Sequence, residues 1–570
     1  MTPTPTADDV TAHTLLNCLV REVSGPEGQT SVHDGHLLVR LPRRDLLLRV
    51  ALRRAVLAGP QRFTGPASVL RSGTWEPLAW HPLALAVRDE LTLRTGVAND
   101  EFVGQVESSH AAVAAVLRYP RPSYDGHLGA YLASEQSLVF GHRHHPTPKA
   151  GPGASPEWLR HAPETGARFP LRLLAVRSDA VRDSTGDGDY GLPGEVPPGY
   201  LPLPAHPWQL RLLAGDPALR ACLADGRLLD LGTAGPDVVP TSSVRTVYHP
   251  GMDAFLKFSL GVRITNCIRT NASYELSGAV ALTRLLAPVA ADLAARFPGV
   301  TLLREPFSRT VEGPLVEGLG VIVREGLGGH LRPGVTPLLA GALADEHSGL
   351  LASLVRDPVA WFDAYVRLLV PPVLHAYFQH GVVLEPHLQN VVVGVGPDGV
   401  PAQVFLRDLE GVKLVESAHR ATLSGLPPQV AYDAERGWNR VVYCLLVNHL
   451  GELLAAVADL RPSVERTLWS LVRARLDDHR HTYGDSPQLR ALLSGVPLPG
   501  KANLLTRWQR HADRLADYVP VPNPWGAPSL TALVPDVGPP DVARCLTALV
   551  PEAGPSEVAL SEAAVPGAAR

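Results

Sequence analysis

The sequence predicts a multidomain α+β protein in which strand-rich parts precede a largely helical part. Its 570 residues correspond to about three or four domains of roughly 150 residues each. Helix-like and strand-like patterns alternate up to about residue 345, and helix-like patterns dominate from there to about residue 525. A Gly/Pro/Ser-rich run at residues 150–157 marks a further boundary. Together these features predict separate segments at residues 1–150, 151–345, 346–525 and 526–570.

The composition is that of an ordinary globular protein. A hydrophobic share of 45%, a charged share of 19% and a net charge of −4 give no indication of a nucleic-acid or membrane partner. We find no run of the ~18 apolar residues that spans a bilayer, and residues 1–24 lack the apolar run of a signal peptide. The five cysteines stand singly, without CxxC spacing or a disulfide framework. We therefore expect a cytoplasmic protein.

Residues 1–150 are expected to combine strands with helices and to carry chemistry only at their end. The expected helices cover residues 11–23, 82–94, 102–118 and the surroundings of Tyr131, and the expected strands cover residues 36–41 and 45–52. His142, His144, His145 and Lys149 then crowd onto one Gly/Pro-bounded loop. Metal binding is one interpretation of this loop. The other is a loop whose histidines cap backbone groups or contact substrate, because no cysteine or carboxylate completes a zinc set.

Residues 237–250 are expected to form a strand with a hydroxyl-rich turn at its head, and residues 252–265 are expected to form a strand pair. Ser242, Ser243, Arg245 and Thr246 can cradle a phosphate through hydroxyl groups, backbone N–H groups and a guanidinium. Lys257 follows on a strand, like the lysine with which kinases hold α- and β-phosphates. The alternative is that these residues are a helix N-cap with a solvated arginine. The closeness of the hydroxyl-rich turn, Lys257 and the next expected helix start in the sequence weakens this alternative.

Groups that suit a carboxylate stand at two expected helix starts. The segment ITNCIRTNASYEL is expected to enter a helix, with Thr265 or Asn266 at its start and Arg269 one turn in. Helix N-termini favour anions because unpaired N–H groups and the helix dipole point at them, and an arginine can bind a carboxylate with two hydrogen bonds. His206 precedes another helix, where Pro207 fixes its direction. On this stretch alone, a capping or packing histidine is the favoured interpretation of His206.

Residues 380–411 predict a nucleotide site built on a β-hairpin. Two apolar β-branched runs flank a Gly-Pro-Asp-Gly turn at residues 396–399. Glu385, His387, Gln389 and Asn390 precede the first strand, and Arg407, Asp408 and Glu410 follow the second. Because a hairpin brings its strand ends together, Asn390 and Asp408 should face each other. Protein kinases hold Mg²⁺ with an Asn and an Asp in this geometry.

The remaining elements are expected to be mainly helical. The expected helices cover residues 276–296, 351–380 with a break at Pro371 and Pro372, 429–457, 464–480 and 488–493. LTALVPDVGP at residues 530–539 returns as LTALVPEAGP at residues 546–555, which is too few copies for a solenoid. We expect the Ala/Pro/Gly-rich residues 526–570 to be a mobile extension or docking segment.

Taken together, these motifs resemble one family, the siderophore synthetases that work independently of nonribosomal peptide synthetases, or IucA/IucC family. The resemblance rests on EQSLVFGHRHHPTPK, HPWQ, PTSSVRT, KFSLGVRITNCIRT, HGVVLEPHLQN and RDLEG, whose order and spacing cover most of residues 10–525. Two departures lie beside implied ligands. Cys267 stands where a threonine is common, and Pro386 and Leu388 replace the more usual small residue and glycine around His387.

The resemblance implies a fold and an activity. The fold is hand-like, with residues 1–150 as thumb, residues 151–345 as fingers with an antiparallel sheet, and residues 346–525 as a largely helical palm. The activity uses ATP and Mg²⁺ to convert a carboxylate of citrate, a related polycarboxylate, or a citryl or succinyl derivative into an acyl-adenylate. An amine, hydroxylamine or hydroxyl nucleophile then displaces AMP. A homodimer is also implied.

Matching positions imply roles for individual residues. Those implied to bind ATP are Ser242, Ser243, Arg245, Thr246, Lys257, His387, Gln389, Asn390 and Asp408. Those implied to bind the polycarboxylate are His206, Thr265, Asn266, Arg269 and His387, and those implied to hold Mg²⁺ are Glu385, Asn390 and Asp408. Lys257, Arg269 and His387 are the implied catalytic residues. Lys257 would stabilise the negative charge that develops on phosphate oxygens.

Two other functional classes stay open at this point. In a small-molecule kinase, Lys257, Asn390 and Asp408 would serve γ-phosphoryl transfer equally well, although no glycine-rich loop precedes Lys257 and no HRD-type base is present. A non-enzymatic ligand sensor with a degenerate cleft is disfavoured, because each polar motif is intact.

Overall fold

The structure is a computed structural model that describes residues 5–126, 128–185, 191–264, 267–512 and 516–526, without the side chains of residues 263–268. Backbone contacts divide the chain into residues 1–531 and 532–570, and all described residues belong to the first unit. Thr265, Asn266 and both copies of the repeated segment therefore lie outside the described residues. The domain boundaries at residues 150, 345 and 525 stay predictions.

An antiparallel five-stranded sheet and three helices form the N-terminal part. The strands are β1 (Thr30–His33), β2 (His36–Leu41), β3 (Leu46–Arg54), β4 (Arg62–Arg71) and β5 (Thr74–Leu78), side by side in sequence order. Helices α1 (Ala7–Leu19), α2 (Trp80–Thr95) and α3 (Glu101–Val116) share one hydrophobic core with them. Every second residue of β2 is buried, as expected for a strand with one face against a core.

An eight-stranded sheet occupies the middle of the sequence. Its strands, in spatial order, are β7 (Val181–Thr185), β15 (Phe307–Val311), β16 (Val321–Glu325), β11 (Ala254–Phe258), β10 (Thr246–His249), β9 (Leu228–Pro240), β6 (Phe169–Arg177) and β8 (Tyr200–Ala205). All pairs are antiparallel, as expected for residues 151–345. The register sets Thr246 opposite Lys257, and opposed residues share a face of the sheet.

Short elements border this sheet. Helices α5 (Pro156–Leu159), α6 (Pro207–Leu213) and α7 (Pro217–Ala224) all begin with proline, whose missing N–H costs no hydrogen bond at that position. A two-stranded ribbon, β12 (Leu260–Ile264) and β13 (Cys267–Arg269), follows β11 directly.

The hairpin predicted at residues 391–406 is present in a four-stranded sheet. The strand order is β14 (Val300–Leu302), β20 (Pro401–Leu406), β19 (Val391–Val395) and β17 (Thr336–Leu339). Gly399 closes the turn with a φ of 84°, which glycine adopts without strain. At the other end, Val391 pairs with Leu406, and the Arg407 N–H donates to the Asn390 carbonyl at 3.1 Å. The hairpin thus joins the two polar stretches.

The part of the chain from residue 273 on is mainly helical, which was expected for residues 346–525. Its helices are α8 (Ser273–Arg296), α9 (Ala340–Ala344), α10 (Leu350–Leu354), α11 (Pro358–His380), α12 (Glu416–Leu423), α13 (Ala434–Val442), α14 (Gly451–Leu460), α15 (Glu465–Tyr483), α16 (Pro487–Leu493) and α17 (Asn503–Trp508). Small strands add β18 (Val382–Val383) with β21 (Lys413–Val415) and β22 (Ala431–Tyr432), and β23 (Leu498–Lys501) with β24 (Tyr518–Val521). Helices α8, α11, α13, α14 and α15 contribute to one large core.

The expected break at Pro371 and Pro372 is wrong. Helix α11 continues through both prolines, and the chain leaves the helical conformation earlier, between α10 and α11. A proline inside a helix removes a backbone hydrogen bond. Here Val370, Val373 and Leu374 are almost completely buried around the prolines, and the burial of this apolar surface outweighs the lost bonds.

Two helical stretches are long and apolar enough to cross a membrane, which the sequence expectation missed. They are Ser273–Arg296 and Ala434–Leu460. The second joins α13 to α14 through a π-helical segment, Tyr443–Leu450, and its whole apolar window is buried inside the protein, against 44% for the first. A core helix satisfies the same criteria of length and composition, so these stretches carry no argument for a membrane.

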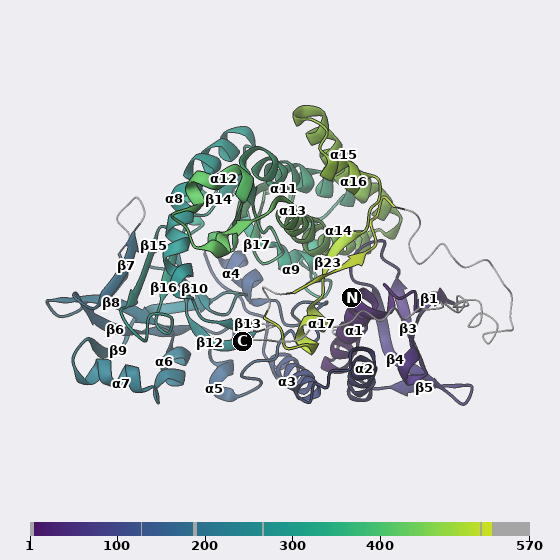
Figure 1. The fold of residues 1–570 in the computed structure, drawn as a ribbon, viewed down its shortest axis with the longest axis horizontal. Coiled ribbons are helices and arrows are strands. Elements are labelled where there is room, and N and C mark those ends of the chain that lie inside the picture. The colour runs from purple at the N-terminus through teal and green to yellow at the C-terminus, as the bar shows by residue number, and fades with distance from the viewer. Residues whose placement is uncertain (1–4, 127, 186–190, 265–266, 513–515, 527–570) are drawn as a thin grey trace, which may run out of the picture. The chain divides into compact units, whose positions relative to one another are not determined.

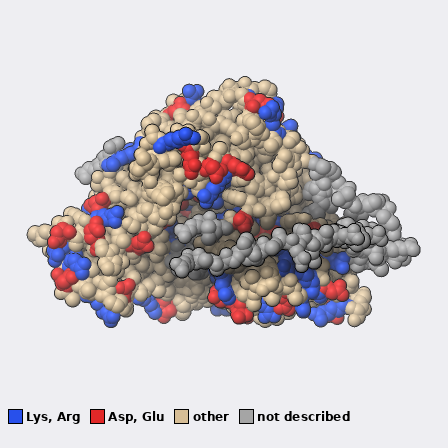
Figure 2. Space-filling view, viewed as in Figure 1, with Lys and Arg blue, Asp and Glu red and all other residues tan. Residues whose placement is uncertain are grey.

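Helix α4 (Gly129–Gln136) lies between the eight-stranded and the four-stranded sheet (Figure 1). Tyr131 and Leu132 pack in one core with Phe255 of β11 and Phe405 of β20. The two sheets and α4 therefore hold the polar motifs of three separate stretches close together. On the face shown in Figure 2, acidic and basic side chains of the described residues are interspersed, in keeping with the small net charge.

Candidate functional site

Lys257 and Asp408 meet where the eight-stranded sheet faces the end of the hairpin. Lys257 Nζ lies 2.5 Å from Asp408 Oδ1, and Arg324 of β16 donates to the same oxygen at 2.6 Å. Asp408 has a φ of 78°, a conformation that is uncommon for residues other than glycine. Burial acts to raise the pKa of Asp408, but Lys257 and Arg324 outweigh it and hold this pKa well below its usual range. Asp408 is therefore a carboxylate that faces two fixed cations.

Glu410 extends this ion cluster. Its carboxylate pairs with Lys257 and lies 3.5 Å from the Arg245 guanidinium. Arg245 also donates to Asn271 Oδ1 at 2.6 Å, and Asn271 itself is completely buried and donates to the Lys257 carbonyl. Burial acts to lower the pKa of Lys257, but Asp408 and Glu410 raise it overall, so the ammonium stays charged. Asn271 positions both cations.

A second network joins helix α4, the hydroxyl-rich turn and the hairpin. Glu135 of α4 accepts hydrogen bonds from the Ser242 hydroxyl at 2.7 Å and pairs with Arg407 at 2.6 Å. Arg407 also donates to the Gln389 carbonyl and to the Tyr131 hydroxyl, both at 2.7 Å. The side chains of Glu135 and Arg407 are almost completely buried, so this pair holds the turn and the hairpin at a fixed separation.

Asn390 and Glu385 occupy the loop before the hairpin. Asn390 Nδ2 donates to the Glu385 carbonyl at 3.3 Å, and no donor contacts its Oδ1 among the described residues. The Glu385 carboxylate pairs with Arg440 of α13 at 2.7 Å. Burial acts to raise the pKa of Glu385, but Arg440 lowers it overall. Of the residues implied to hold Mg²⁺, Asn390 and Asp408 flank the hairpin end, and Glu385 already has a cationic partner.

His387 lies in the same loop and is half-buried. Its backbone N–H donates to the Glu385 carbonyl, and its carbonyl accepts from the Asn390 N–H, both at 2.8 Å. Burial lowers the pKa of His387 to about 4, so the imidazole is neutral near pH 7. The turn places His387 between Glu385 and the metal candidate Asn390.

His206 caps helix α6, as the sequence favoured. Its Nδ1 accepts from the Trp208 N–H at 3.1 Å, and its ring packs against His161 and Phe169. Burial lowers the pKa of His206 to about 3. The other ring nitrogen, Nε2, is buried and has no hydrogen-bond partner among the described residues. His206 therefore has one nitrogen in the cap and a second that can serve a ligand.

Arg269 and the hydroxyl-rich turn lie next to each other. The Arg245 guanidinium contacts the carbonyls of Arg269 and Thr270 at 3.4 and 3.3 Å. Val244 adopts a φ of 69° between Ser243 and Arg245, which makes the turn sharp. Gln389 approaches Ser242 at 3.5 Å from the hairpin side. The structure thus brings together the residues implied to bind ATP, whereas Thr265 and Asn266 lie outside the described residues.

The histidine loop at residues 142–149 contacts the protein itself. His142 Nδ1 accepts from the His144 N–H at 3.0 Å, and His142 Nε2 contacts Asn448 at 2.9 Å. His144 Nδ1 lies 3.3 Å from Glu452, and Lys149 pairs with Glu164. These contacts favour the interpretation in which the histidines cap backbone groups and pack.

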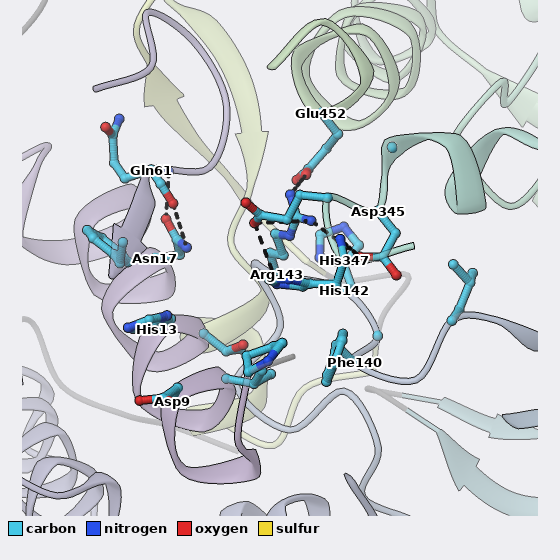
Figure 3. Close-up of a pocket in the computed structure, with 18 of the residues that line it drawn as sticks. Asp9, His13, Asn17, Gln61, Phe140, His142, Arg143, Asp345, His347 and Glu452 are labelled. Atoms are coloured by element: carbon cyan, nitrogen blue, oxygen red, sulfur yellow. Dashed lines mark hydrogen bonds and ion pairs between the residues drawn. The ribbon is translucent and has the colours of Figure 1, made fainter. Parts of the chain in front are cut away.

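A cavity of about 410 Å³ lies beside this loop and helix α1 (Figure 3). Its lining includes His13 and Asn17 of α1, His142, and the carboxylates of Asp345 and Glu452. Of the loop that carries His387, only Leu388 lines it. The cavity is therefore separate from the residues implied to bind ATP.

Several residues of the site were not singled out in the sequence. They are Glu135, Asn271, Glu305, Arg324 and Arg440, which pair with or position the predicted residues. The sequence held one usable signal for Arg324. It stands in the apolar strand VIVRE at residues 321–325, and a buried arginine needs a partner. Arg324 finds two, Glu305 and Asp408, each at 2.6 Å.

Four cations and four carboxylates of the site form two groups of ion pairs. Lys257, Arg245, Arg324 and Arg407 are paired with Asp408, Glu410, Glu305 and Glu135. Such an arrangement can hold phosphate oxygens with its cations and a metal ion with its carboxylates.

Known proteins resemble this chain along most of its length. The IucA / IucC family matches residues 130–345, and a family described as "Ferric iron reductase FhuF-like transporter" matches residues 359–516. An L-2,3-diaminopropanoate–citrate ligase of Staphylococcus aureus is 31% identical over 434 residues, which are 69% of this chain and 74% of the relative. The rhizobactin siderophore biosynthesis protein RhbC of Rhizobium meliloti is 29% identical over 555 residues, 88% of this chain and 94% of the relative.

Solved structures share the fold. The ATP-bound aerobactin synthetase IucA of Klebsiella pneumoniae superposes with a TM-score of 0.79 at 22% identity, over 92% of this chain and 100% of that chain. The petrobactin biosynthesis protein AsbB of Bacillus anthracis superposes with a TM-score of 0.73 at 20% identity, over 91% and 95% of the two chains. The motifs, the fold and these relatives agree, and the chain belongs to the IucA/IucC family of siderophore synthetases that act independently of nonribosomal peptide synthetases.

Proposed function

We propose that this ligase acts in siderophore biosynthesis and joins citrate, or a related polycarboxylate, to an amine or hydroxyl nucleophile with ATP. Relatives of this family carry names such as diaminopropanoate–citrate ligase and spermidine–citrate ligase, and a structural neighbour is ATP-bound. The proposed sequence has two steps. The carboxylate first forms an acyl-adenylate with release of pyrophosphate, and the nucleophile then forms the amide or ester with release of AMP.

One observation carries the proposal: Lys257 of the eight-stranded sheet pairs with Asp408 and Glu410 at the end of the hairpin. The ammonium is buried, stays charged and is held on a strand, so it is fixed in place before substrate arrives. Fixed cations that face developing phosphate charge supply most of the catalysis in such reactions. Arg245 is held by Asn271 beside it and adds a second fixed cation.

The residues at the hairpin end fit a magnesium ion, which prefers oxygen ligands. Asp408 and the Asn390 Oδ1 offer such atoms on either side of the hairpin, and Glu410, which the sequence also placed at the hairpin end, adds a further carboxylate. Glu385 fits less well, because its carboxylate is paired with Arg440. When bound, the ion would neutralise phosphate charge. Asp408 and Glu410 would then be shared with it, which would leave Lys257 and Arg245 for the phosphate oxygens.

The polycarboxylate is proposed to lie between the β12–β13 ribbon and helix α6. Arg269 ends β13, and His206 Nε2 is the unpartnered buried nitrogen at the start of α6. Gln209 of α6 ties the two elements together, because its amide contacts the backbone of Gly261 and Gly318 at 2.7 and 2.8 Å. Thr265 and Asn266, which lie outside the described residues, are proposed to bind the same substrate.

In the first step, a carboxylate oxygen attacks the α-phosphorus and the bond to the β-phosphate oxygen breaks. In the second step, the nucleophile attacks the acyl carbon, the bond from that carbon to the phosphate oxygen breaks, and AMP leaves with the former carboxylate oxygen. The amine must lose a proton during the second step. His387 is neutral near pH 7 and half-buried in the loop before the hairpin, so we propose that it accepts this proton.

The products formed from ATP distinguish the proposed ligase activity from the activity of a kinase. The enzyme with citrate, Mg²⁺, ATP and hydroxylamine as a general nucleophile should form AMP, pyrophosphate and a hydroxamate. Formation of ADP and a phosphorylated acid would replace the proposal with phosphoryl transfer. Replacing citrate by succinyl hydroxamates and by 2-oxoglutarate in the same assay identifies the carboxylate that the enzyme prefers.

We further propose a cytoplasmic homodimer with small-molecule substrates and without nucleic-acid or membrane partners. Cytoplasmic location suits an enzyme that consumes ATP. Light scattering of the purified protein measures the mass directly, and a mass of one chain would contradict the dimer.

A further inference from the structure

Three ligand-type side chains outside the proposed active site converge on one point between α8 and α11. His375 Nε2 and His380 Nε2 lie 2.7 and 2.9 Å from a single oxygen, Asp292 Oδ2. All three ligand atoms lie within 4.8 Å of one another. Among the described residues, this is the one group of three or more His, Cys, Asp or Glu side chains with that geometry.

The three ligand atoms come together only because α8 and α11 both contribute to the site. His375 and His380 are five positions apart on α11, whereas side chains on one face of a helix are three or four positions apart. Asp292 comes from the last turns of α8 and lies between the two imidazoles. Helices α8 and α11 pack against each other along this region (Figure 1).

Surrounding groups hold the three side chains in place. Arg296 donates to the other carboxylate oxygen, Asp292 Oδ1, at 2.6 Å and leaves Oδ2 directed at the histidines. The His375 ring packs edge-on against Phe297 and Tyr483. His419 contacts the His380 carbonyl at 2.7 Å and fixes the end of α11. Partners that orient ligands in this way are typical of metal sites.

The degree of burial suits a metal site with an entry path. The His375 side chain is 3% exposed, and those of Asp292 and His380 are 28% exposed. Two imidazoles and one carboxylate form a ligand set that zinc uses with a water molecule in the fourth position. Ligand atoms around a tetrahedral zinc are about 3.3 Å apart, so the two nitrogen–oxygen separations of 2.7 and 2.9 Å need to open by about half an ångström. The two imidazole nitrogens lie within 4.8 Å of each other.

We propose that Asp292, His375 and His380 bind one divalent transition-metal ion, Zn²⁺, which clamps α8 to α11. Beyond His380 the chain continues through β18 to Glu385 and His387. The Val415 N–H donates to the Gly381 carbonyl at 2.8 Å, which also ties this point to the strand after Glu410. The ion would therefore stiffen the support behind the hairpin loop without contacting substrate. The proposal does not depend on the reaction that the enzyme catalyses.

The competing account is that Asp292 simply accepts hydrogen bonds from both imidazoles. Cobalt(II) separates the two accounts, because it occupies zinc sites and absorbs visible light when bound to imidazole and carboxylate ligands. The full-length protein, freed of any affinity tag and treated with a chelator, is titrated with Co²⁺ and then with Zn²⁺, without ATP or citrate. Native mass spectrometry counts the bound ions.

We expect one Co²⁺ ion per chain, displaced by Zn²⁺, and a higher melting temperature with Zn²⁺. Asp292→Asn and His380→Gln should each weaken metal binding at least ten-fold. Asp363→Asn is the matched control, because Asp363 is 26% exposed, lies on α11 and pairs with Arg367 four positions on, as Asp292 pairs with Arg296. It should bind metal like the wild type.

Two results would overturn the proposal. One is the lack of a stoichiometric ion at micromolar Co²⁺ or Zn²⁺ in the wild type. The other is metal binding by Asp292→Asn and His380→Gln as tight as in the wild type. Circular dichroism and the melting temperature of metal-free protein establish that each variant folds. Because binding is read without substrates, failure here leaves the ligase proposal intact, and failure of adenylation leaves this one intact.

Discussion

Lys257 Nζ and Asp408 Oδ1 lie 2.5 Å apart although the two residues are 151 positions apart in the sequence. The pair joins a strand of the eight-stranded sheet to the end of a hairpin in the four-stranded sheet. Lys257→Met keeps the length of the side chain and removes the charge. We expect pyrophosphate release to fall about 10²–10³-fold, as for the loss of one fixed group that stabilises transition-state charge. A loss below ten-fold in steady-state assays with saturating ATP would contradict the role of Lys257.

Arg269→Ala should affect the carboxylate more than ATP. A bidentate charged hydrogen bond contributes about 1.5–3 kcal/mol, so the KM for citrate should rise roughly ten-fold or more. The KM for ATP should change little. Pyrophosphate release measured against each substrate in turn gives both constants, and an equal rise in both would move Arg269 out of the carboxylate site.

His206 allows its two nitrogens to be tested separately. His206→Asn keeps an acceptor for the Trp208 N–H, since asparagine is a good N-cap, and removes the atom at the Nε2 position. We expect nearly unchanged thermal stability and a raised KM for citrate. His206→Ala also removes the cap and should lower stability by about 1 kcal/mol. If His206→Asn used citrate as well as the wild type, the histidine would be a cap alone.

Arg407 and Glu135 should be coupled in their contributions to the free energy of unfolding. Arg407→Met leaves the Glu135 carboxylate buried without its partner, which costs about 3–5 kcal/mol. Adding Glu135→Gln removes the unpaired charge and should restore part of this loss. Urea unfolding of the two single variants and the double variant measures the coupling, and strictly additive effects would contradict the proposed pair.

Glu275 should make the stability of the folded protein depend on pH. Its carboxylate caps the backbone of Ala272, and burial together with Glu410 raises its pKa from 4.5 to about 7. The folded state therefore binds this proton more tightly than the unfolded state, and stability is lost as the pH rises from about 4.5 through 7. Glu275→Gln keeps the acceptor and removes the charge. It should match the wild type near pH 4.5 and exceed it at pH 8 by on the order of 2 kcal/mol.

Melting curves of Glu275→Gln and the wild type across this pH range provide the test. An advantage of the variant that is equal at pH 5 and pH 8 would show that Glu275 does not carry this proton.

Local patterns predicted much of the fold. The strand at residues 36–41 and the hairpin around residues 396–399 follow from alternating or β-branched apolar residues and from turn residues that leave few local alternatives. The expected proline break in α11 was wrong because a local rule was applied where Val370, Val373 and Leu374 around the prolines are almost completely buried. The apolar window of Ala434–Leu460 is wholly buried in the core, whereas 44% of the window of α8 is buried. The hand-like arrangement stays a prediction.

The site could be predicted only in part, because pairing partners come from distant stretches. The hairpin argument placed Asn390 near Asp408 from sequence alone, and the structure agrees. Nothing local links Arg407 to Glu135 or Arg324 to Glu305, since these contacts depend on how α4 and β16 pack against the hairpin. The pairing of Glu385 with Arg440 likewise depends on the position of α13. The roles of these residues in substrate and metal binding stay predictions.

The most direct test follows the carboxylate oxygen. Citrate labelled with oxygen-18 in its carboxylates is incubated with the enzyme, Mg²⁺, ATP and hydroxylamine, and the nucleotide product is analysed by mass spectrometry. Attack of a carboxylate oxygen on the α-phosphorus predicts AMP that carries one oxygen-18 atom. Unlabelled AMP, or ADP as the nucleotide product, would contradict the proposed adenylation.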